Sequence, residues 1–547
     1  MDIAQRVART VAQLGVTRAY GLPGEDHMAL LDALAGAGIT YQTAYNESSA
    51  VIMAATDAQL TGRPGLVVLS LAPGVSNGMN GILHAHLEGL PVLVLAGQHP
   101  AAKLPFVVRQ GFDTEQMVRP AAKWTTSVPA GADPAELVCK AVDIALDARP
   151  GPVYLELPDE VAVAPAPVSE RGDNATALLA AELDEASRRR PVLTPAAATT
   201  DELARRLAAA EHPALIVGGR GAPVSSEVLA RFSETCRVPV FTTTGQKGAL
   251  DGRSAYFAGT LLNGNLEARL LERADLILTV DFEAYDIYNK PWRYTAPTVS
   301  ISRRPLLEWF QPFDLRVVAD PDACLTALTE RVGGGGPSRF TPKDVTAYRD
   351  DLRATLLDTA PEGLSVARAV DAVLRGCDQE TVVLADAGFS KPLLALLSDT
   401  HARGRFLASS ALSTMGFAIP AGIAAAHASG ERVVAFMGDG SLLMRATEVA
   451  AAHSAPVPPV FVAVVDRSLS QIEIKQSRRG LRTVGVGLPE ISCRALGEAL
   501  GIRGRDAHSV EEIEAAMASA WDASTPLLLG VHVEPSTSQP IYDLLRG

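Results

Sequence analysis

Two aspartates stand at points of the sequence where strand-like apolar runs stop. Asp439 lies in a Gly-Asp-Gly triplet after the run VVAFM, and Asp466 follows the run PVFVAVV. Their spacing fits a strand end, a crossover helix and the end of the next parallel strand. Because ligand crevices lie beyond the carboxyl ends of parallel strands, we expect both carboxylates in one crevice. Their hard oxygen atoms suit Mg²⁺ or Ca²⁺, which usually also take phosphate oxygens.

The residues around Asp439 favour a phosphate beside that cation. Gly438 and Gly440 let the backbone approach a phosphate, and Ser441 stands at the start of the following helix. The N–H groups and the dipole at a helix N-terminus attract anions. The pattern therefore predicts a metal-clamped diphosphate site. The alternative is a pair of turn aspartates, which are frequent after strands, and the two residues alone leave both interpretations open.

The elements that must hold these residues follow an α/β pattern along the chain. Short apolar runs alternate with helical patterns, and Gly and Pro mark the joins, which predicts βα units and largely parallel sheets. We expect three doubly wound parallel-sheet domains, of which the first and the last are alike in architecture. The predicted segments are a first domain at 1–165, a linker with room for one helix at 166–198, a middle domain at 199–332 and a last domain at 340–547.

The composition restricts the class of partner. The chain has 547 residues, of which 47% are hydrophobic and 20% charged, and its net charge is −13. That balance argues against a nucleic-acid or anionic-membrane partner. The longest apolar runs are too short to span a bilayer, and the opening stretch MDIAQRVARTVAQLG predicts an amphipathic helix rather than a signal peptide. The five cysteines lie far apart without a C-x-x-C pair, which indicates reduced thiols in a cytoplasmic protein.

Several ordered motifs resemble the signatures of thiamine diphosphate (ThDP) enzymes. In that family an Asn pair follows the G-D-G triplet, and this chain has Val465-Asp466 at the pair, which is similar to the catabolic acetolactate synthases. YGLPGEDHMALLDAL resembles the family's first strand, turn and helix, and residues 45–98 resemble its pyrimidine-binding domain. SSALSTMGFAIPAGIAAA resembles its S-G-G-L-G-x-M-G segment. The chain is therefore identified as an acetolactate synthase-like member of the pyruvate decarboxylase and acetohydroxyacid synthase superfamily.

The resemblance implies a ThDP cofactor that is held through Mg²⁺, between a pyrimidine-binding first domain and a diphosphate-binding last domain. It assigns Asp439, Asp466 and the backbone carbonyl of Ser468 as metal ligands. Glu47, in YNESSA, matches the glutamate that activates the cofactor's pyrimidine ring, and Met415 matches the large apolar residue that bends the cofactor. The other residues that it assigns to cofactor binding are Gly388, Phe389, Ser390, Ser413, Gly438, Gly440, Ser441, Pro73 and Asn77.

The resemblance also implies an enzyme that removes CO₂ from a 2-oxo acid and leaves an enamine with two fates. Gln110, in VVRQGF, aligns with a glutamine of the acetolactate synthases and favours attack on a carbonyl acceptor. Glu25, in LPGEDH, stands where simple decarboxylases have an acid, which favours protonation to an aldehyde and repels a second anionic substrate. We predict a carboligase, with a simple 2-oxo acid decarboxylase as the alternative. A non-catalytic binding protein that kept the fold is the alternative from another class.

Three further expectations concern the middle domain, a lysine of the last domain and the assembly. The stretch HPALIVGGRGAPVSSEVL has a Gly-rich turn, but Ser302 and residues 281–283 depart from the pattern of relatives that bind FAD, so FAD is not expected. In the last domain, Lys391 is expected to be exposed. Because active sites in the family lie between chains, we expect a homodimer or a homotetramer that acts on a small-molecule 2-oxo acid and an aldehyde or ketone acceptor.

Overall fold

The computed structural model describes most of the chain. The described residues are 1–100, 102–129, 131–147, 149–185, 192–219, 224–287, 291–305, 313–333, 338–359 and 363–546. Parts of three predicted features lie outside them, namely residues 186–191 of the linker, 220–223 of the Gly-rich turn and 334–337 between the middle and last domains. No helix among the described residues is long and apolar enough to cross a bilayer.

The chain divides into two compact units, and each is described by itself. Unit 1 comprises Met1–Arg190, Ala411–Val433 and Arg445–Pro459, and unit 2 comprises Pro191–Ser410, Val434–Met444 and Val460–Gly547. Unit 1 therefore includes two pieces of the segment predicted as the last domain. These pieces carry α16 (Ala418–Ser429) and the 3₁₀ helix η6 (Ala446–Ser454), and α16 packs against α3 of the same unit.

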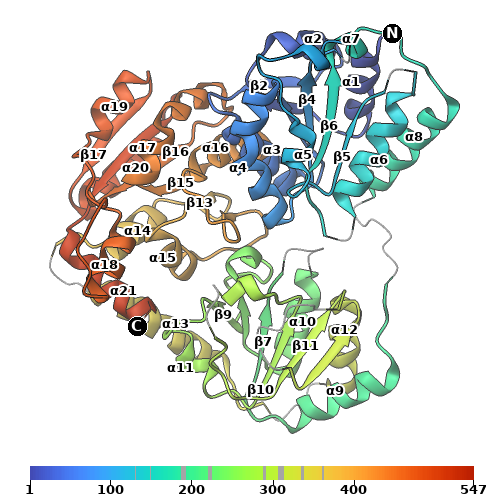
Figure 1. Ribbon diagram of the computed structural model, residues 1–547. Coiled ribbons are helices and arrows are strands. Elements are labelled where there is room, and N and C mark those ends of the chain that lie inside the picture. The colour runs from blue at the N-terminus through green and yellow to red at the C-terminus, as the bar shows by residue number, and fades with distance from the viewer. Residues whose placement is uncertain are drawn as a thin grey trace. The chain divides into compact units, whose positions relative to one another are not determined.

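Unit 1 contains a six-stranded parallel sheet with helices on both faces (Figure 1). Its strands, in spatial order, are β2 (Thr40–Thr43), β1 (Arg18–Gly21), β3 (Gly65–Leu69), β4 (Val92–Gln98), β6 (Val153–Pro158) and β5 (Trp124–Ser127). Its helices are α1 (Ile3–Gln13), α2 (Met28–Gly36), α3 (Glu47–Thr61), α4 (Ala72–Glu88), α5 (Thr114–Val118), α6 (Pro134–Leu146), α7 (Asp159–Ala162) and α8 (Glu170–Asp184). Alternate strand residues such as Leu66, Val68 and Leu93 share a core with α1, α2 and α6, while α3 contacts β1, β3 and β4.

Unit 2 contains two more six-stranded parallel sheets (Figure 1). The middle sheet runs β12 (Leu315–Val318), β11 (Thr298–Ser302), β10 (Leu276–Val280), β7 (Pro213–Val217), β8 (Val240–Thr242) and β9 (Phe257–Thr260). The last sheet runs β14 (Phe406–Ala408), β13 (Val382–Ala385), β15 (Val433–Gly438), β16 (Val460–Val465), β18 (Leu527–His532) and β17 (Arg503–Ala507). Helices of this unit are α9 (Ala197–Ala209), α10 (Ser226–Cys236), α11 (Ala268–Leu271), α12 (Pro321–Val332), α13 (Pro342–Asp358), α14 (Val366–Arg375), α15 (Ser390–Leu397), α17 (Asp439–Arg445), α18 (Ser470–Arg478), α19 (Cys493–Ala499), α20 (Val510–Ala520) and α21 (Ser538–Arg546).

The strand orders confirm the predicted doubly wound α/β class. When the strands of each sheet are counted along the chain, the first and the last sheet share the order 2-1-3-4-6-5, whereas the middle sheet has the order 3-2-1-4-5-6. In such sheets the connections change direction at one point, and ligands bind beyond the carboxyl ends of the strands there. That point lies between β1 and β3 in the first sheet and between β13 and β15 in the last.

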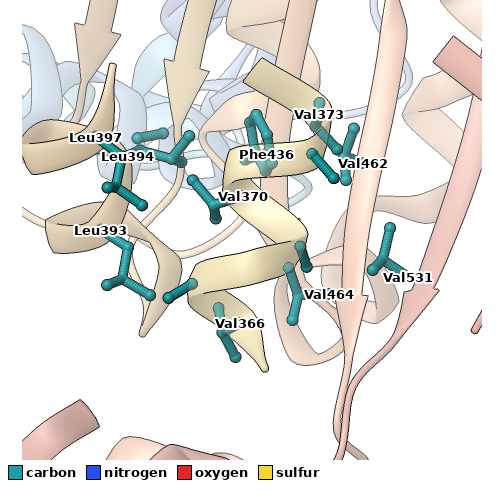
Figure 2. Packing of buried hydrophobic residues seen from close by; sticks show 14 of the residues in the cluster. Val366, Val370, Val373, Leu393, Leu394, Leu397, Phe436, Val462, Val464 and Val531 are labelled. Atoms are coloured by element: carbon teal, nitrogen blue, oxygen red, sulfur yellow. The ribbon is translucent and has the colours of Figure 1, made fainter. Parts of the chain in front are cut away.

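A hydrophobic cluster holds the helices near the point where the connections of the last sheet change direction. Val366, Val370 and Val373 of α14 pack with leucines of α15 and with alternate residues of β16, including Val462 and Val464 (Figure 2). β16 reads VFVAVV and is buried along its whole length, as expected of a parallel strand that is covered on both faces. The polar residue that follows it is Asp466, so the apolar core ends where the carboxylate begins.

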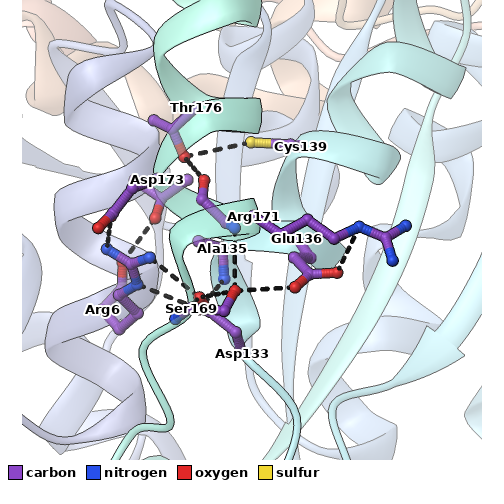
Figure 3. A network of polar contacts seen from close by, with 11 residues as sticks. Arg6, Asp133, Ala135, Glu136, Cys139, Ser169, Arg171, Asp173 and Thr176 are labelled. Atoms are coloured by element: carbon purple, nitrogen blue, oxygen red, sulfur yellow. Dashed lines mark hydrogen bonds and ion pairs between the residues drawn. The ribbon is translucent and has the colours of Figure 1, made fainter.

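A polar cluster ties α8, which lies in the segment predicted as a linker, to the first sheet's helices. The Arg6 side chain is 1% exposed and bonds Asp133, which caps α6, through Nη2 at 3.0 Å, and Asp173 of α8 through Nη1 at 2.7 Å (Figure 3). The Ser169 N–H also donates to Asp133, at 2.9 Å. Burial alone raises the pKa of Asp133, but these donors and the Ala135 N–H lower it to about 2. The ion pair is thus fully formed at neutral pH.

Candidate active site

The first group of predicted residues lies in unit 1, near the point between β1 and β3 where the connections of the first sheet change direction. Glu47 is the first residue of α3, and the Asn46 side chain caps this helix by accepting the Ser48 N–H at 2.9 Å. The Asn77 amide on α4 donates to Glu47. A Cβ built on Gly74, in the first turn of α4, would lie 3.6 Å from Glu47 Oε1. The structure therefore brings Glu47, Asn77 and the turn that contains Pro73 together.

A buried polar clamp holds the start of α3, and sequence reasoning missed it. Glu448 of η6 is 2% exposed and accepts the Tyr45 N–H at 2.8 Å, and Arg445 Nη1 donates to Asn46 Oδ1 at 2.9 Å. Burial raises the pKa of Glu448 above its usual range, and the nearby Glu47 charge raises it further, although hydrogen bonds oppose this. The sequence signal was present, because RATEVAAAH places two charged residues in an otherwise small and apolar helical stretch.

Glu25 and Gln110 lie in loops of the same unit. Glu25 is exposed and opens the 3₁₀ helix η1 (Glu25–His27) after β1. Gln110 is exposed and lies in the loop between η2 (Leu104–Phe106) and α5. Among the described residues, no hydrogen bond or ion pair links either side chain to Glu47.

Two predicted residues, and one residue between two predicted ones, have unusual backbone conformations. Only six non-glycine residues of the described chain have positive φ, and among them are Gln110 at 59°, Ser413 at 51° and Arg467 at 60°, the last lying between Asp466 and Ser468. Left-handed conformations at non-glycine residues are strained and gather at functional sites. Met415, two residues after Ser413, is half-buried, and the intervening Thr414 hydroxyl bonds Asn80 of α4 at 2.9 Å.

The second group lies at the carboxyl ends of β15 and β16, in unit 2. Asp439 Oδ1 accepts the Gly440 N–H at 2.8 Å, and its Oδ2 accepts the Arg467 N–H at 2.8 Å, so this one carboxylate links the ends of both strands. Asp466 accepts the Ser468 N–H at 3.1 Å and the Ser470 hydroxyl. The two aspartates are 2% and 9% exposed.

These two acids fit a divalent cation. Burial, and then the neighbouring Asp466 charge, raise the pKa of Asp439 to about 6, and burial also raises the pKa of Asp466. Two buried like charges need a compensating cation if both are to stay ionised. Carboxylate oxygens, with the Ser468 backbone carbonyl as a third donor, form the hard oxygen set that Mg²⁺ prefers.

The glycines beside the acids leave the backbone accessible. Nothing lies within 4 Å of a Cβ built on Gly438 or on Gly388, and Gly388 has φ of 152°. Gly440 and Ser441 continue into α17, where the Ser441 hydroxyl donates to the buried Asp386 at 3.2 Å. The Phe389 side chain belongs to the hydrophobic core and Ser390 starts α15, so the backbone of Phe389 is the part left to face a ligand.

Lys391 is not exposed, contrary to the expectation from sequence. Its side chain is buried at 6% exposure, and its Nζ donates to the Ser409 carbonyl at 2.9 Å. Lys391 lies in the buried first turn of α15, and the carbonyl partner comes from the loop after β14. An ammonium with such a partner tolerates burial, and no local sequence pattern indicates that partner.

At the corresponding edge of the middle sheet, several polar groups of the described residues bond one another. The Arg303 N–H donates to Asp281 Oδ1 at 3.0 Å, and the Arg303 guanidinium also bonds Asp320 at 3.2 Å. The Gly219 N–H donates to Asp286 at 3.1 Å, and a Cβ on Gly219 would lie 2.1 Å from the Asp281 carbonyl oxygen. The acidic and basic groups named here are therefore paired within the protein.

Three family models match successive parts of the chain. They are described as thiamine pyrophosphate enzyme, N-terminal TPP binding domain (residues 1–118), central domain (residues 200–328) and C-terminal TPP binding domain (residues 386–531). Glu47 and Asn77 fall within the match to the N-terminal TPP binding domain. Asp439 and Asp466 fall within the match to the C-terminal one.

Curated relatives match nearly the whole chain at low identity. The chain is 26% identical to the catabolic acetolactate synthase of Raoultella terrigena, over 95% of this chain and 93% of the relative. It is 25% identical to an acetolactate synthase of Bacillus subtilis, over 97% and 93%. It is 27% identical to a probable 2-ketoarginine decarboxylase of Pseudomonas aeruginosa, over 97% and 93%.

Proposed function

Since the chain belongs to the thiamine pyrophosphate enzyme family, we propose that it is a ThDP- and Mg²⁺-dependent carboligase. It removes CO₂ from a 2-oxo acid and joins the remaining acyl fragment to a carbonyl acceptor. The observation that carries the proposal is the pair of buried, mutually repelling aspartates at the carboxyl ends of adjacent strands β15 and β16. A fold kept only as a scaffold has no need of such a pair.

Each half of the proposed site has a distinct task. When bound, ThDP supplies the electron sink for cleavage of the bond between the carboxyl and carbonyl carbons. Asp439, Asp466 and the Ser468 carbonyl would hold Mg²⁺, and the open backbone at Gly438 and Gly388 would face the diphosphate. Glu47 would hold a proton at the pyrimidine ring, steadied by Asn77.

A simple decarboxylase is the second candidate, and Glu25 favours it. A carboxylic acid near the reacting carbon delivers a proton and so yields an aldehyde. It also repels a second anionic 2-oxo acid, which disfavours condensation of two such substrates. One relative at similar identity is a probable 2-ketoarginine decarboxylase, so both outcomes occur among the proteins that the chain resembles.

A panel of 2-oxo acids tests the proposal. CO₂ release is measured with each acid alone and with an added aldehyde acceptor, and the products are identified by mass spectrometry. A 2-hydroxyketone or acetolactate-type product supports the carboligase, and an aldehyde as the sole product supports the decarboxylase. A protein that binds ThDP and releases no CO₂ from any 2-oxo acid is a non-catalytic member of the fold.

We further propose that the enzyme works as a homodimer or a homotetramer and without FAD. In the assembly, the residues of unit 1 in one copy act on the same cofactor as the residues of unit 2 in the other. The contacts of Arg303 and Asp281 at the middle sheet's edge support the absence of a flavin, because a nucleotide there would have to displace them. The absorbance of the purified protein above 400 nm, a range in which flavins absorb, checks this point.

A further inference from the structure

The turn that carries Glu25 is held by the residue that follows it. Asp26 Oδ1 accepts the Ser70 hydroxyl at 2.6 Å, and its Oδ2 accepts the Leu71 N–H at 3.0 Å. Burial alone raises the pKa of Asp26, but the nearby His27 ring and the hydrogen bond from Ser70 bring it below its usual value. Asp26 therefore ties the turn after β1 to the loop between β3 and α4.

His27 closes the same turn from inside. Its side chain is buried, and Nε2 accepts the Gly24 N–H at 3.0 Å. A backbone N–H can only donate, so Nε2 carries the lone pair and the ring proton lies on Nδ1. Nδ1 lies 3.4 Å from Asp26 Oδ2. The imidazole thus fastens the start of the turn, and its Nδ1 lies near the Asp26 carboxylate without a hydrogen bond to it.

The backbone around the turn leaves room for these side chains and little else. A Cβ on Gly97 of β4 would lie 1.7 Å from Asp26 Oδ2, and a Cβ on Gly24 would lie 2.8 Å from both the His27 ring and Ser70 Oγ. Only glycine fits at either position without movement of Asp26 or His27. The arrangement therefore depends on two glycines that leave room and on three side chains that make the contacts, those of Asp26, His27 and Ser70.

The loop that anchors Asp26 also lies close to the Glu47 carboxylate. A Cβ on Gly74 would lie 3.2 Å from Ser70 Cβ and 3.6 Å from Glu47 Oε1. The first turn of α4 therefore lies beside both the anchor of Asp26 and the predicted activating acid. Glu25, between Gly24 and Asp26, has no anchor of its own among the described residues, so its neighbours set its position.

We propose that Asp26 and His27 are positioning residues that hold Glu25 in reach of the reacting carbon and so set the share of substrate released as aldehyde. This inference rests on the proposed function. Loss of CO₂ leaves an electron pair on the former carbonyl carbon. A proton from Glu25 bonds that carbon to give the aldehyde, and solvent returns a proton to Glu25. Alternatively, that carbon bonds the acceptor's carbonyl carbon and the acceptor oxygen takes a proton, which gives the hydroxyketone.

The test compares His27→Leu, which removes both ring nitrogens, with His27→Gln, whose amide oxygen can still accept the Gly24 N–H. Amide hydrogen exchange of residues 20–30 in the protein without cofactor reads the turn directly. We expect faster exchange in His27→Leu and near wild-type exchange in His27→Gln. His427→Leu is the matched control, because His427 is a half-buried histidine of the same unit that bonds Ser454 at 3.2 Å, away from this turn.

The second readout is the aldehyde fraction of total CO₂ released from pyruvate. Because a misplaced general acid loses most of its effect, we expect that fraction to fall about 10-fold in His27→Leu and to recover in His27→Gln. In a Glu25→Gln background, His27→Leu should add no further change, since the two residues act on one step. A purely structural role would lower all rates together and leave the fraction unchanged.

The outcomes separate this inference from the proposed function. Three results would overturn the inference alone. The first is a His27→Leu variant that turns over with an unchanged aldehyde fraction, and the second is a wild-type protein that forms no aldehyde. The third is a His27→Leu substitution that changes the aldehyde fraction as much in the Glu25→Gln background as in the wild type. A wild-type protein with a protected turn and no CO₂ release from any 2-oxo acid overturns the proposed function, and the inference with it.

Discussion

At the scale of single residues, the two strand-end aspartates differ in what their contacts allow. Both oxygens of Asp439 accept backbone N–H groups, from Gly440 and Arg467. Asp466 has one backbone donor, Ser468, and one hydroxyl partner, Ser470, which can also accept a hydrogen bond. An amide therefore fits at position 466, but at 439 its NH₂ group would face a backbone N–H.

This difference predicts unequal effects of the same substitution. Asp466→Asn should keep ThDP binding in Mg²⁺ within about 10-fold of wild type, because an amide oxygen remains a hard ligand. Asp439→Asn should weaken binding about 100-fold, because it leaves a buried donor unpaired and removes a charge beside the cation. Isothermal titration with ThDP in Mg²⁺ measures both values. Equal binding by the two variants would contradict the assignment of the ligands.

Glu47 and Glu25 are expected to act at different stages. Glu47→Gln should retain ThDP and lose CO₂ release by about 10²–10⁴-fold, because the pyrimidine ring loses its proton partner. Glu25→Gln should leave the activation of the cofactor intact and change the products. Exchange of the cofactor's C2 proton with D₂O, followed by NMR, distinguishes a loss of cofactor activation from a change of product. Wild-type exchange in Glu47→Gln would show that another group activates the cofactor.

Sequence motifs predicted the candidate acids but not the residues that support them. Asp439, Asp466 and Glu47 stand at the ends of apolar patterns, where strands stop and helices start, so local sequence places them. Glu448 reaches Tyr45, and Arg445 reaches Asn46, only because η6 packs in the same unit as α3. Contacts between segments remote in sequence depend on tertiary packing, which no local pattern specifies.

At the scale of elements, the polar cluster of Arg6 and Asp133 fastens three helices. α1 contributes Arg6, the N-cap of α6 contributes Asp133, and α8 contributes Asp173 (Figure 3). The sequence predicted the alternation of strands and helices that defines the α/β class, because apolar runs and caps are local. For the segment that contains α8, the sequence predicted only a linker with room for one helix. The ion pair that holds α8 joins residues far apart in the sequence, so no local pattern indicates it.

Breaking this cluster should destabilise unit 1 strongly. Arg6→Met leaves Asp133 buried without its cation and should lower the free energy of unfolding by about 3–5 kcal/mol. Arg171→Met is the control, because the Arg171 side chain is 86% exposed in its pair with Glu136, and we expect a change of at most about 1 kcal/mol. Urea unfolding followed by circular dichroism measures both. Similar losses in the two variants would contradict the role given to burial.

The same cluster predicts how stability depends on pH. The pKa of Asp133 is about 2 in the folded protein, below its ordinary value of 3.8. Between these two pH values Asp133 binds a proton in the unfolded chain but not in the folded protein. The contribution of its ion pair to folding stability is therefore present above about pH 3.8 and is lost as the pH falls toward 2. The difference in urea midpoint between wild type and Arg6→Met should shrink across that range. A difference that stays constant down to the folded pKa would exclude Asp133 as its source.

At the scale of the whole molecule, the first and last sheets repeat one strand order and carry acids near their changes of direction. Glu47 belongs to unit 1, and Asp439 and Asp466 belong to unit 2. The motifs predicted both groups and the three-domain α/β architecture, since each motif is local to one strand end. The number of chains per active site is a property of assembly, which a single sequence does not encode in any local pattern.

Complementation between variants tests the proposed assembly. Glu47→Gln and Asp439→Ala are each expected to be inactive, but a hybrid dimer would have one site with both changes and one with neither. Random assembly after co-expression should then restore about a quarter of wild-type CO₂ release. Size-exclusion chromatography confirms that the variants still associate. No recovery in verified hybrids would mean that each active site uses one chain.

Binding of ThDP to the purified wild-type protein, measured by isothermal titration with Mg²⁺ and again after chelation, decides whether a divalent cation holds this cofactor. We predict saturable binding with Mg²⁺ that disappears with a chelator and returns when the cation is restored. Failure to bind ThDP in the presence of Mg²⁺, Mn²⁺ or Ca²⁺ would contradict the account.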